Sequence, residues 1–136
     1  MKNTWKNTLL VAFAGIALLV TPFLSADEIE KANIPFQFTA GEKVYPAGMY
    51  EFRVDLASRV VKVTQDPKGA AGFVPFITTM AATTHSTATD NHIVFDKVGN
   101  NYTLSEIWQP GEDGILVHAT RGAHEHHVIH VPKKQR

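Results

Sequence analysis

The strongest constraint on the fold is the spacing of the apolar residues, which recur at every second position or in short runs from Ile34 onward. Side chains of an extended strand alternate between two faces, so a period of two places one apolar face against a core. No window long enough for a globular helix has the i, i+3, i+4 spacing in this region. We therefore predict an all-β domain whose strands have one buried and one solvated face.

Proline and glycine divide this pattern into short segments. Pro46-Ala47-Gly48 lies between residues 43–45 and 49–55 and predicts a tight hairpin, because proline presets φ and glycine accepts the left-handed conformation. Val98-Gly99-Asn100-Asn101 predicts a second hairpin within residues 92–108. The remaining predicted strands cover residues 34–38, 59–65, 73–79, 115–119 and 123–131, and residues 81–91 are predicted as a loop or a weak strand.

Further turn and edge signals complete the predicted topology. Gly41-Glu42 turns the chain after the first predicted strand. Pro35 and Pro75 cannot donate a ladder hydrogen bond, which indicates sheet edges or a bulge at these positions. About eight to ten short strands separated by turns favour a single-domain antiparallel sandwich or a small barrel. The pattern does not separate these two architectures.

The N-terminus has the layout of a secretory signal peptide. Two lysines precede an uncharged apolar run over residues 9–20, and Pro22 then ends the signal-peptide helix. The run is shorter than the roughly 20 residues that a membrane-spanning helix needs. We predict a signal peptide over residues 1–26, cleaved after Ala26, and an exported domain over residues 27–136 that is periplasmic or secreted and has no membrane span. An uncleaved anchor is the alternative, because Leu24 is large for its place before the cut.

Cysteine content and charge exclude several functional classes. The chain has no cysteine, so disulfides, thiolate metal ligands, thiol catalysis and lipid attachment at a cysteine are excluded. Cleavage would remove Lys2 and Lys6 and leave all 13 acidic residues, which makes the exported part slightly acidic. Non-specific binding to nucleic acid is therefore disfavoured. The short basic tail after Pro132 is interpreted as a solvated chain end.

Two segments of the chain carry a resemblance to other proteins. Residues 34–50 read I-P-F-Q-F, then Gly41, then P-A-G-M-Y, and residues 93–108 hold Ile93-Val94-Phe95 and Tyr102-Thr103-Leu104 through Ile107-Trp108. This series resembles a group of small exported bacterial β-proteins that lack an assigned activity, in which an I-P-F-x-F, glycine, P-A-G-x-Y pattern follows the signal peptide. The resemblance implies an exported β-domain and transfers no catalytic residue.

A dense cluster of histidines near the C-terminus is the main candidate for chemistry. Four of the seven histidines fall within residues 122–130. In an extended strand His124, His126 and His130 point to one face and His127 to the other. A His-x-His pair can share a zinc, copper or nickel ion at about 2.0–2.1 Å from each nitrogen, with a third ligand from elsewhere. The candidate metal ligands are His118, His124, His126, His127 and His130.

Other interpretations of these and neighbouring side chains stay open. The histidines either bind metal only adventitiously or lie on a wet strand face without any metal role. Glu106 shares a predicted strand face with Tyr102, Leu104 and Trp108, which makes it a candidate carboxylate in an aromatic pocket or a simple surface residue. The larger aromatic side chains form either the core or the wall of a ligand cleft: Tyr45, Tyr50, Phe73, Phe76 and Trp108.

No motif in the chain fixes a reaction. Nucleophile-elbow serines, paired catalytic carboxylates and glycine-rich phosphate loops are absent from the sequence. We expect a non-enzymatic exported β-domain with a binding or structural role in the cell envelope and an envelope or extracellular partner. A transition-metal-binding protein that uses the C-terminal histidines is the first alternative, and a carrier of a small apolar ligand is the second.

Overall fold

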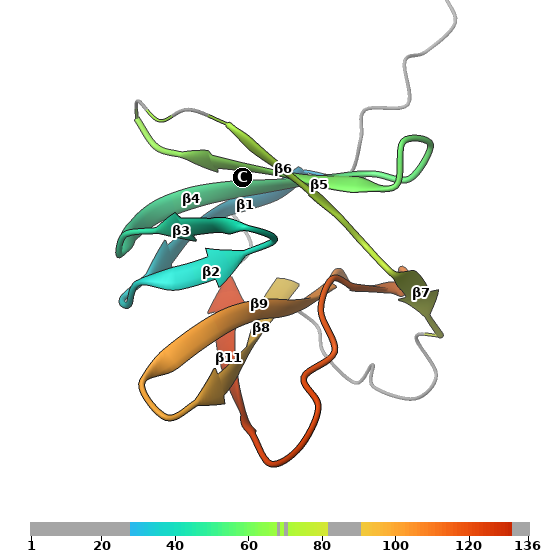
Figure 1. The fold of residues 1–136 in the computed structure, drawn as a ribbon. Helices are drawn as coiled ribbons and strands as arrows, with labels where there is room; N and C mark the ends of the chain where they lie inside the picture. Colours follow the sequence, from blue (N-terminus) through green and yellow to red (C-terminus); the bar gives the residue numbers. More distant parts are fainter. Residues whose placement is uncertain (1–27, 68, 70, 82–90, 132–136) are drawn as a thin grey trace, which may run out of the picture.

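The computed structural model describes residues 28–67, 69, 71–81 and 91–131. These residues form eleven β-strands in two sheets, and the described part of the chain contains no helix. The predicted all-β fold is therefore confirmed (Figure 1). The predicted signal peptide over residues 1–26, most of the 81–91 stretch and the basic tail lie outside the described residues. No helix among the described residues is long and apolar enough to span a membrane.

The strands divide into a four-stranded and a seven-stranded sheet. The smaller sheet is antiparallel and has the order β1 (Glu28–Ile34), β4 (Gly48–Asp55), β5 (Val60–Gln65), β6 (Gly72–Pro75). The main path of the larger sheet is β11 (Glu125–Val131), β8 (Asn91–Val98), β9 (Asn101–Trp108), β10 (Gly114–Leu116), β7 (Thr78–Met80). Its remaining strands are β2 (Phe38–Ala40), which pairs in parallel with β9, and β3 (Lys43–Tyr45), which pairs with β2.

Residues 34–38 pass from one sheet to the other, so the predicted first strand over this segment is wrong. Ile34 is the last residue of β1 and Phe38 is the first residue of β2. Both side chains are buried, with exposed fractions of 0% and 1%. The apolar alternation therefore arises because the side chains of Ile34 and Phe38 enter the same core from different sheets. Pro35 lies where no ladder hydrogen bond is needed, which suits its missing N–H group.

The Pro46-Ala47-Gly48 segment is a second crossing between the sheets and not the predicted hairpin. β3 pairs with β2 around the predicted Gly41-Glu42 turn, where Gly41 has a φ of 61°, whereas β4 pairs with β1 and β5. The Tyr50 hydroxyl donates a hydrogen bond to the Pro46 carbonyl oxygen. A tyrosine that bonds back to the main chain a few residues upstream is a recurrent corner device of β-sandwiches. The P-A-G-x-Y series thus stabilises a corner.

Other strand predictions are confirmed. In β4, Tyr50, Phe52 and Val54 are buried while the intervening residues are partly exposed. β8 and β9 form the predicted hairpin, and the positive φ of Gly99 supports its turn. The predicted strand over residues 73–79 is split around Pro75 into β6 and β7, which lie at the edges of different sheets. Edge positions tolerate a proline because one side of the strand has no ladder partner.

Aromatic rings fill the core between the sheets. The ring of Phe38 lies 5.2 Å from that of Tyr45 and 5.1 Å from those of Tyr50 and Phe95. Burial raises the pKa of the Tyr45 hydroxyl, and burial together with the neighbouring Tyr45 raises that of Tyr50. Phe76 is also buried, whereas Phe73 is 65% exposed. Tyr45, Tyr50 and Phe76 thus belong to the core, whereas Phe73 does not.

A β-bulge at Ser105 changes which side chains of β9 share a face. Val94 lies opposite Glu106 and Phe95 lies opposite Leu104, so Ser105 is the extra residue. The prediction that Glu106 shares a face with Tyr102 and Leu104 is therefore wrong, because the bulge reverses the alternation. The buried Ser105 hydroxyl donates to the His118 carbonyl oxygen at 2.9 Å, and the Ser105 carbonyl oxygen accepts from Val117 N and His118 N.

Candidate metal-binding site

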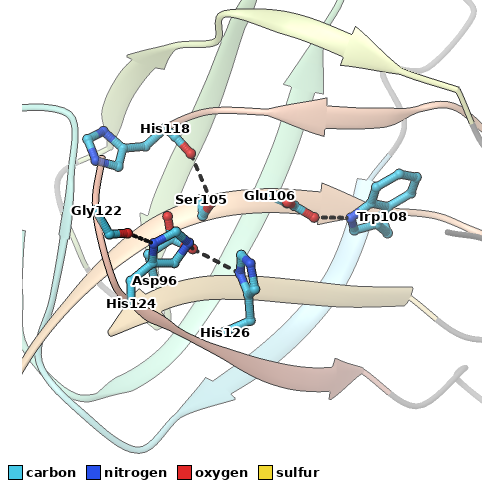
Figure 2. A network of polar contacts seen from close by, with 8 residues as sticks. All are labelled: Asp96, Ser105, Glu106, Trp108, His118, Gly122, His124 and His126. Atoms are coloured by element: carbon cyan, nitrogen blue, oxygen red, sulfur yellow. Dashed lines mark hydrogen bonds and ion pairs between the residues drawn. The ribbon is translucent and has the colours of Figure 1, made fainter. Parts of the chain in front are cut away.

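The candidate site lies where β8 and β11 pair on the outer face of the larger sheet. Asp96 of β8 is directly opposite His126 of β11. Side chains at directly opposite positions share a face, with Cβ atoms about 4.5–5.5 Å apart. Phe95, the neighbour of Asp96, is part of the core, so Asp96 points to the outer face. His124, which immediately precedes β11, brings a third side chain to the same place (Figure 2).

The three side chains converge on one carboxylate oxygen. His126 Nδ1 lies 3.0 Å and His124 Nε2 lies 3.9 Å from Asp96 Oδ1. One ligand-type atom from each of the three residues falls within 4.8 Å of the others. Around a tetrahedral ion, ligand atoms about 2.0–2.2 Å from the metal lie about 3.3–3.6 Å from one another. Small side-chain rotations would therefore bring all three atoms to coordination distance.

A main-chain carbonyl fixes the orientation of His124. His124 Nδ1 lies 2.8 Å from the Gly122 carbonyl oxygen. Because a carbonyl oxygen can only accept, Nδ1 carries the proton, and in the neutral ring Nε2 then has the free lone pair. That nitrogen is the one that faces Asp96. Metal-binding histidines are commonly oriented in this way by a hydrogen bond from the other ring nitrogen.

The Asp96 carboxylate is buried although both histidines reach solvent. Its side chain is 2% exposed, compared with 21% for His124 and 54% for His126. His126 Nδ1 lies 3.0 Å from Asp96 Oδ1, but the relative orientation of the two groups is not that of a hydrogen bond. No described residue donates a hydrogen bond to this oxygen. Buried carboxylates are normally paired with a cation or bound to a metal. In the described part of the chain, the side-chain nitrogens that lie within 4.0 Å of Asp96 Oδ1 are those of these two histidines.

The structure brings two of the five predicted ligands into this group. His118 is exposed in the segment after β10, and its ring points away from Asp96 (Figure 2). His127 lies on the opposite face of β11 from His126, as the alternation predicts, and its ring packs edge-on against Phe36 at 5.1 Å. His130 shares the outer face with His126 but lies four residues further along the strand.

Asp96 is a candidate ligand that the sequence reasoning missed. It lies about 30 residues before the histidines, at the end of an apolar run and close to the Gly99 turn, where a polar residue is ordinary. Only the pairing of β8 with β11 places it opposite His126. Its one local signal is that it lies two residues after Val94, so both side chains point to the outer face of β8.

Glu106 and Trp108 lie beyond His126 on the same outer face. The indole Nε1–H of Trp108 donates to Glu106 Oε2 at 2.7 Å (Figure 2). Trp108 is 2% exposed, and its ring lies against Gly114. A shallow hollow of about 230 Å³ beside this pair is lined by His92, Val94, Glu106, Trp108, His126 and Val128.

Comparison with known proteins identifies no relative that would assign a role to these residues. No protein-family model, curated protein or solved structure matches the chain. The function is therefore argued from the geometry of the site.

Proposed function

We propose that the protein is an exported, non-enzymatic β-domain that binds a divalent transition metal through Asp96, His124 and His126. The observation that carries the proposal is the buried Asp96 Oδ1, which faces one nitrogen of each histidine at 3.0 and 3.9 Å. A buried carboxylate next to two imidazoles calls for a cation between them. The fixed tautomer of His124 leaves a lone pair on the nitrogen that would bind it.

The donor set favours zinc, copper or nickel over calcium or magnesium. Two imidazole nitrogens and one carboxylate oxygen suit these transition metals, whereas calcium and magnesium prefer sites made of oxygen. Within the divalent series, copper is expected to bind most tightly and nickel and zinc more weakly. Further coordination positions would be filled from solvent at the exposed His126 side.

The proposed role is capture or storage of metal in the cell envelope. An exported domain meets metal ions without the buffering of the cytoplasm, and the site is built on the paired strands β8 and β11. Strands hold ligands in a more fixed geometry than loops do. The partially exposed histidines would let the ion enter and leave without unfolding of the domain.

Isothermal titration calorimetry of the exported protein, purified without an affinity tag, tests this function. We expect the tightest Zn²⁺ step to have one ion per chain and to weaken by at least about tenfold in Asp96→Asn and in His124→Ala. Loss of a second-shell partner alone typically lowers metal affinity about 10- to 100-fold. The matched control is His118→Ala, which removes an exposed histidine outside the group and should leave the affinity unchanged.

A peptide of residues 122–131 provides the second control, because it contains the histidines without Asp96 or the sheet. Binding by the folded protein no tighter than by this peptide would contradict the proposal. Equal effects of His118→Ala and His124→Ala would contradict it as well, since both would then act only as scattered surface ligands.

A further inference from the structure

A second pair of histidines lies on the outer face of the same sheet. His92 of β8 is directly opposite His130 of β11. Their ring centroids are 5.9 Å apart, with an angle of 41° between the ring planes. Three pairs of residues along the ladder separate this position from the Asp96–His126 pair, and the offset of four residues corresponds to a spacing of about 13 Å along the strands.

The surroundings of His92 hold its ring in place. The Trp108 indole is stacked on it, with ring centroids 6.0 Å apart and an angle of 13° between the planes. That indole is itself fixed by the hydrogen bond to Glu106 and by its burial. The Nδ1 atom of His92 is buried, and none of the described residues gives it a hydrogen bond. One coordinating position of the ring is thus unused within the described part of the domain.

We propose that His92 and His130 form a second metal site, selective for Cu²⁺, that is separate from the Asp96 site. Two imidazoles bound in cis positions at about 2.0–2.1 Å from one ion have centroids about 4.5–5.2 Å apart. The observed 5.9 Å reaches this range when the exposed His130 side chain moves by about 1 Å. A site with only two protein ligands favours copper, because copper binds imidazole more tightly than the other divalent ions of the first row.

The two sites are expected to load independently. The Val94–Val128 pair lies between them on the ladder, so they share no ligand. A separation of about 13 Å exceeds the Debye length of about 8 Å at physiological ionic strength, which screens the repulsion between two bound ions at the surface. The carboxylate of Glu106, which lines the hollow beside His92, adds a negative charge next to the second site.

The stacked Trp108 provides a local reporter for this site. A paramagnetic Cu²⁺ ion held by His92 would lie next to the indole and quench its fluorescence. The chain contains one other tryptophan, Trp5, which the expected cleavage after Ala26 removes, so Trp108 is the only tryptophan of the exported protein. The exported protein without an affinity tag is titrated with Cu²⁺, and EDTA is added at the end to show that the quenching is reversible. Bound copper is counted in parallel by equilibrium dialysis.

The variants separate the second site from the first. We expect two Cu²⁺ ions per chain in the exported protein and one in its double variant His124→Ala/His126→Ala, which should keep the strong quenching of Trp108. The single variant His130→Ala should retain one ion and lose most of the quenching. It is preferred over a change at His92 because His130 is exposed and does not form the stack with Trp108.

Two results would overturn the second site. One is a copper stoichiometry that His130→Ala leaves unchanged, with quenching that also persists. The other is quenching that disappears in His124→Ala/His126→Ala, which would assign the effect to the Asp96 site. A third outcome separates the two proposals. If the double variant keeps one copper ion and the quenching of Trp108, while Asp96→Asn still binds two copper ions, the second site is upheld and the function proposed for the Asp96 site is contradicted.

Discussion

The replacement Gly114→Ala is predicted to destabilise the domain through one contact, that with the Trp108 indole. A Cβ atom at residue 114 would lie 2.5 Å from Cη2, 2.5 Å from Cζ3 and 2.7 Å from Cε3 of this ring. Carbon atoms in favourable contact are about 3.5–4.0 Å apart, so the indole must move by about 1 Å. The backbone at Gly114 is outside the left-handed region, and alanine itself is therefore not strained there.

The size of the effect follows from two opposing contributions. Overpacking of a fixed core group costs about 1–3 kcal/mol, and Trp108 is fixed because it is 2% exposed and hydrogen-bonded to Glu106. The smaller conformational freedom of alanine in the unfolded chain offsets about 0.4–1 kcal/mol. The net loss is therefore about 1–2 kcal/mol, or a decrease in Tm of roughly 5–10 °C for a domain of this size.

Urea unfolding followed by circular dichroism measures this loss, with Trp108→Phe as the second arm of a double-mutant cycle. In the Trp108→Phe background the alanine faces a smaller ring, so its cost should fall to below about 0.5 kcal/mol. The coupling energy of the cycle then reports the contact directly. An equal cost of Gly114→Ala in both backgrounds would refute the reasoning, as would a cost below about 0.5 kcal/mol in the wild-type background.

Two further predictions concern the corner and a turn. Tyr50→Phe removes the hydrogen bond to the Pro46 carbonyl oxygen and should lower the free energy of unfolding by about 1 kcal/mol; an unchanged urea midpoint would contradict a role for this bond. The main-chain N–H of Ser58 donates to Asp55 Oδ1 at 3.1 Å, and this bond together with one from the Ser58 side chain lowers the pKa of Asp55 below 3.8. A lowered folded-state pKa contributes stability above the unfolded pKa that is lost as pH falls through the folded value, so an NMR titration of Asp55 that gives a pKa at or above 3.8 would contradict this contribution.

The sequence predicted the strands whose patterns are local and failed where pairing is not local. β4 and β5 have one buried face, and their alternation is visible without knowledge of any partner. The β8–β9 hairpin has a local turn signal at Gly99. The Pro46-Ala47-Gly48 turn has the same local chemistry in a hairpin and at a corner between sheets. A hairpin forms if β3 pairs with β4, and a corner forms if β3 pairs with β2. Which strand pairs with β3 depends on residues that are distant in the sequence.

The same limit applies to the candidate site. Alternation along β11 correctly separated His126 from His127, because a strand period needs no partner. Asp96 and His92 come from β8, and the sequence does not reveal which residue of one strand faces which residue of another. The bulge at Ser105 moved Glu106 and Trp108 to the outer face for a related reason, since one inserted residue reverses every later position.

The most direct test of the central claim is a crystal structure of the exported protein grown with Zn²⁺, with diffraction data collected on both sides of the zinc absorption edge. We predict an anomalous peak about 2.0–2.2 Å from His124 Nε2, His126 Nδ1 and Asp96 Oδ1, which disappears in Asp96→Asn crystals grown in the same way. Zinc bound only at His118, His127 or other surface residues, with none beside the Asp96 carboxylate, would contradict the account.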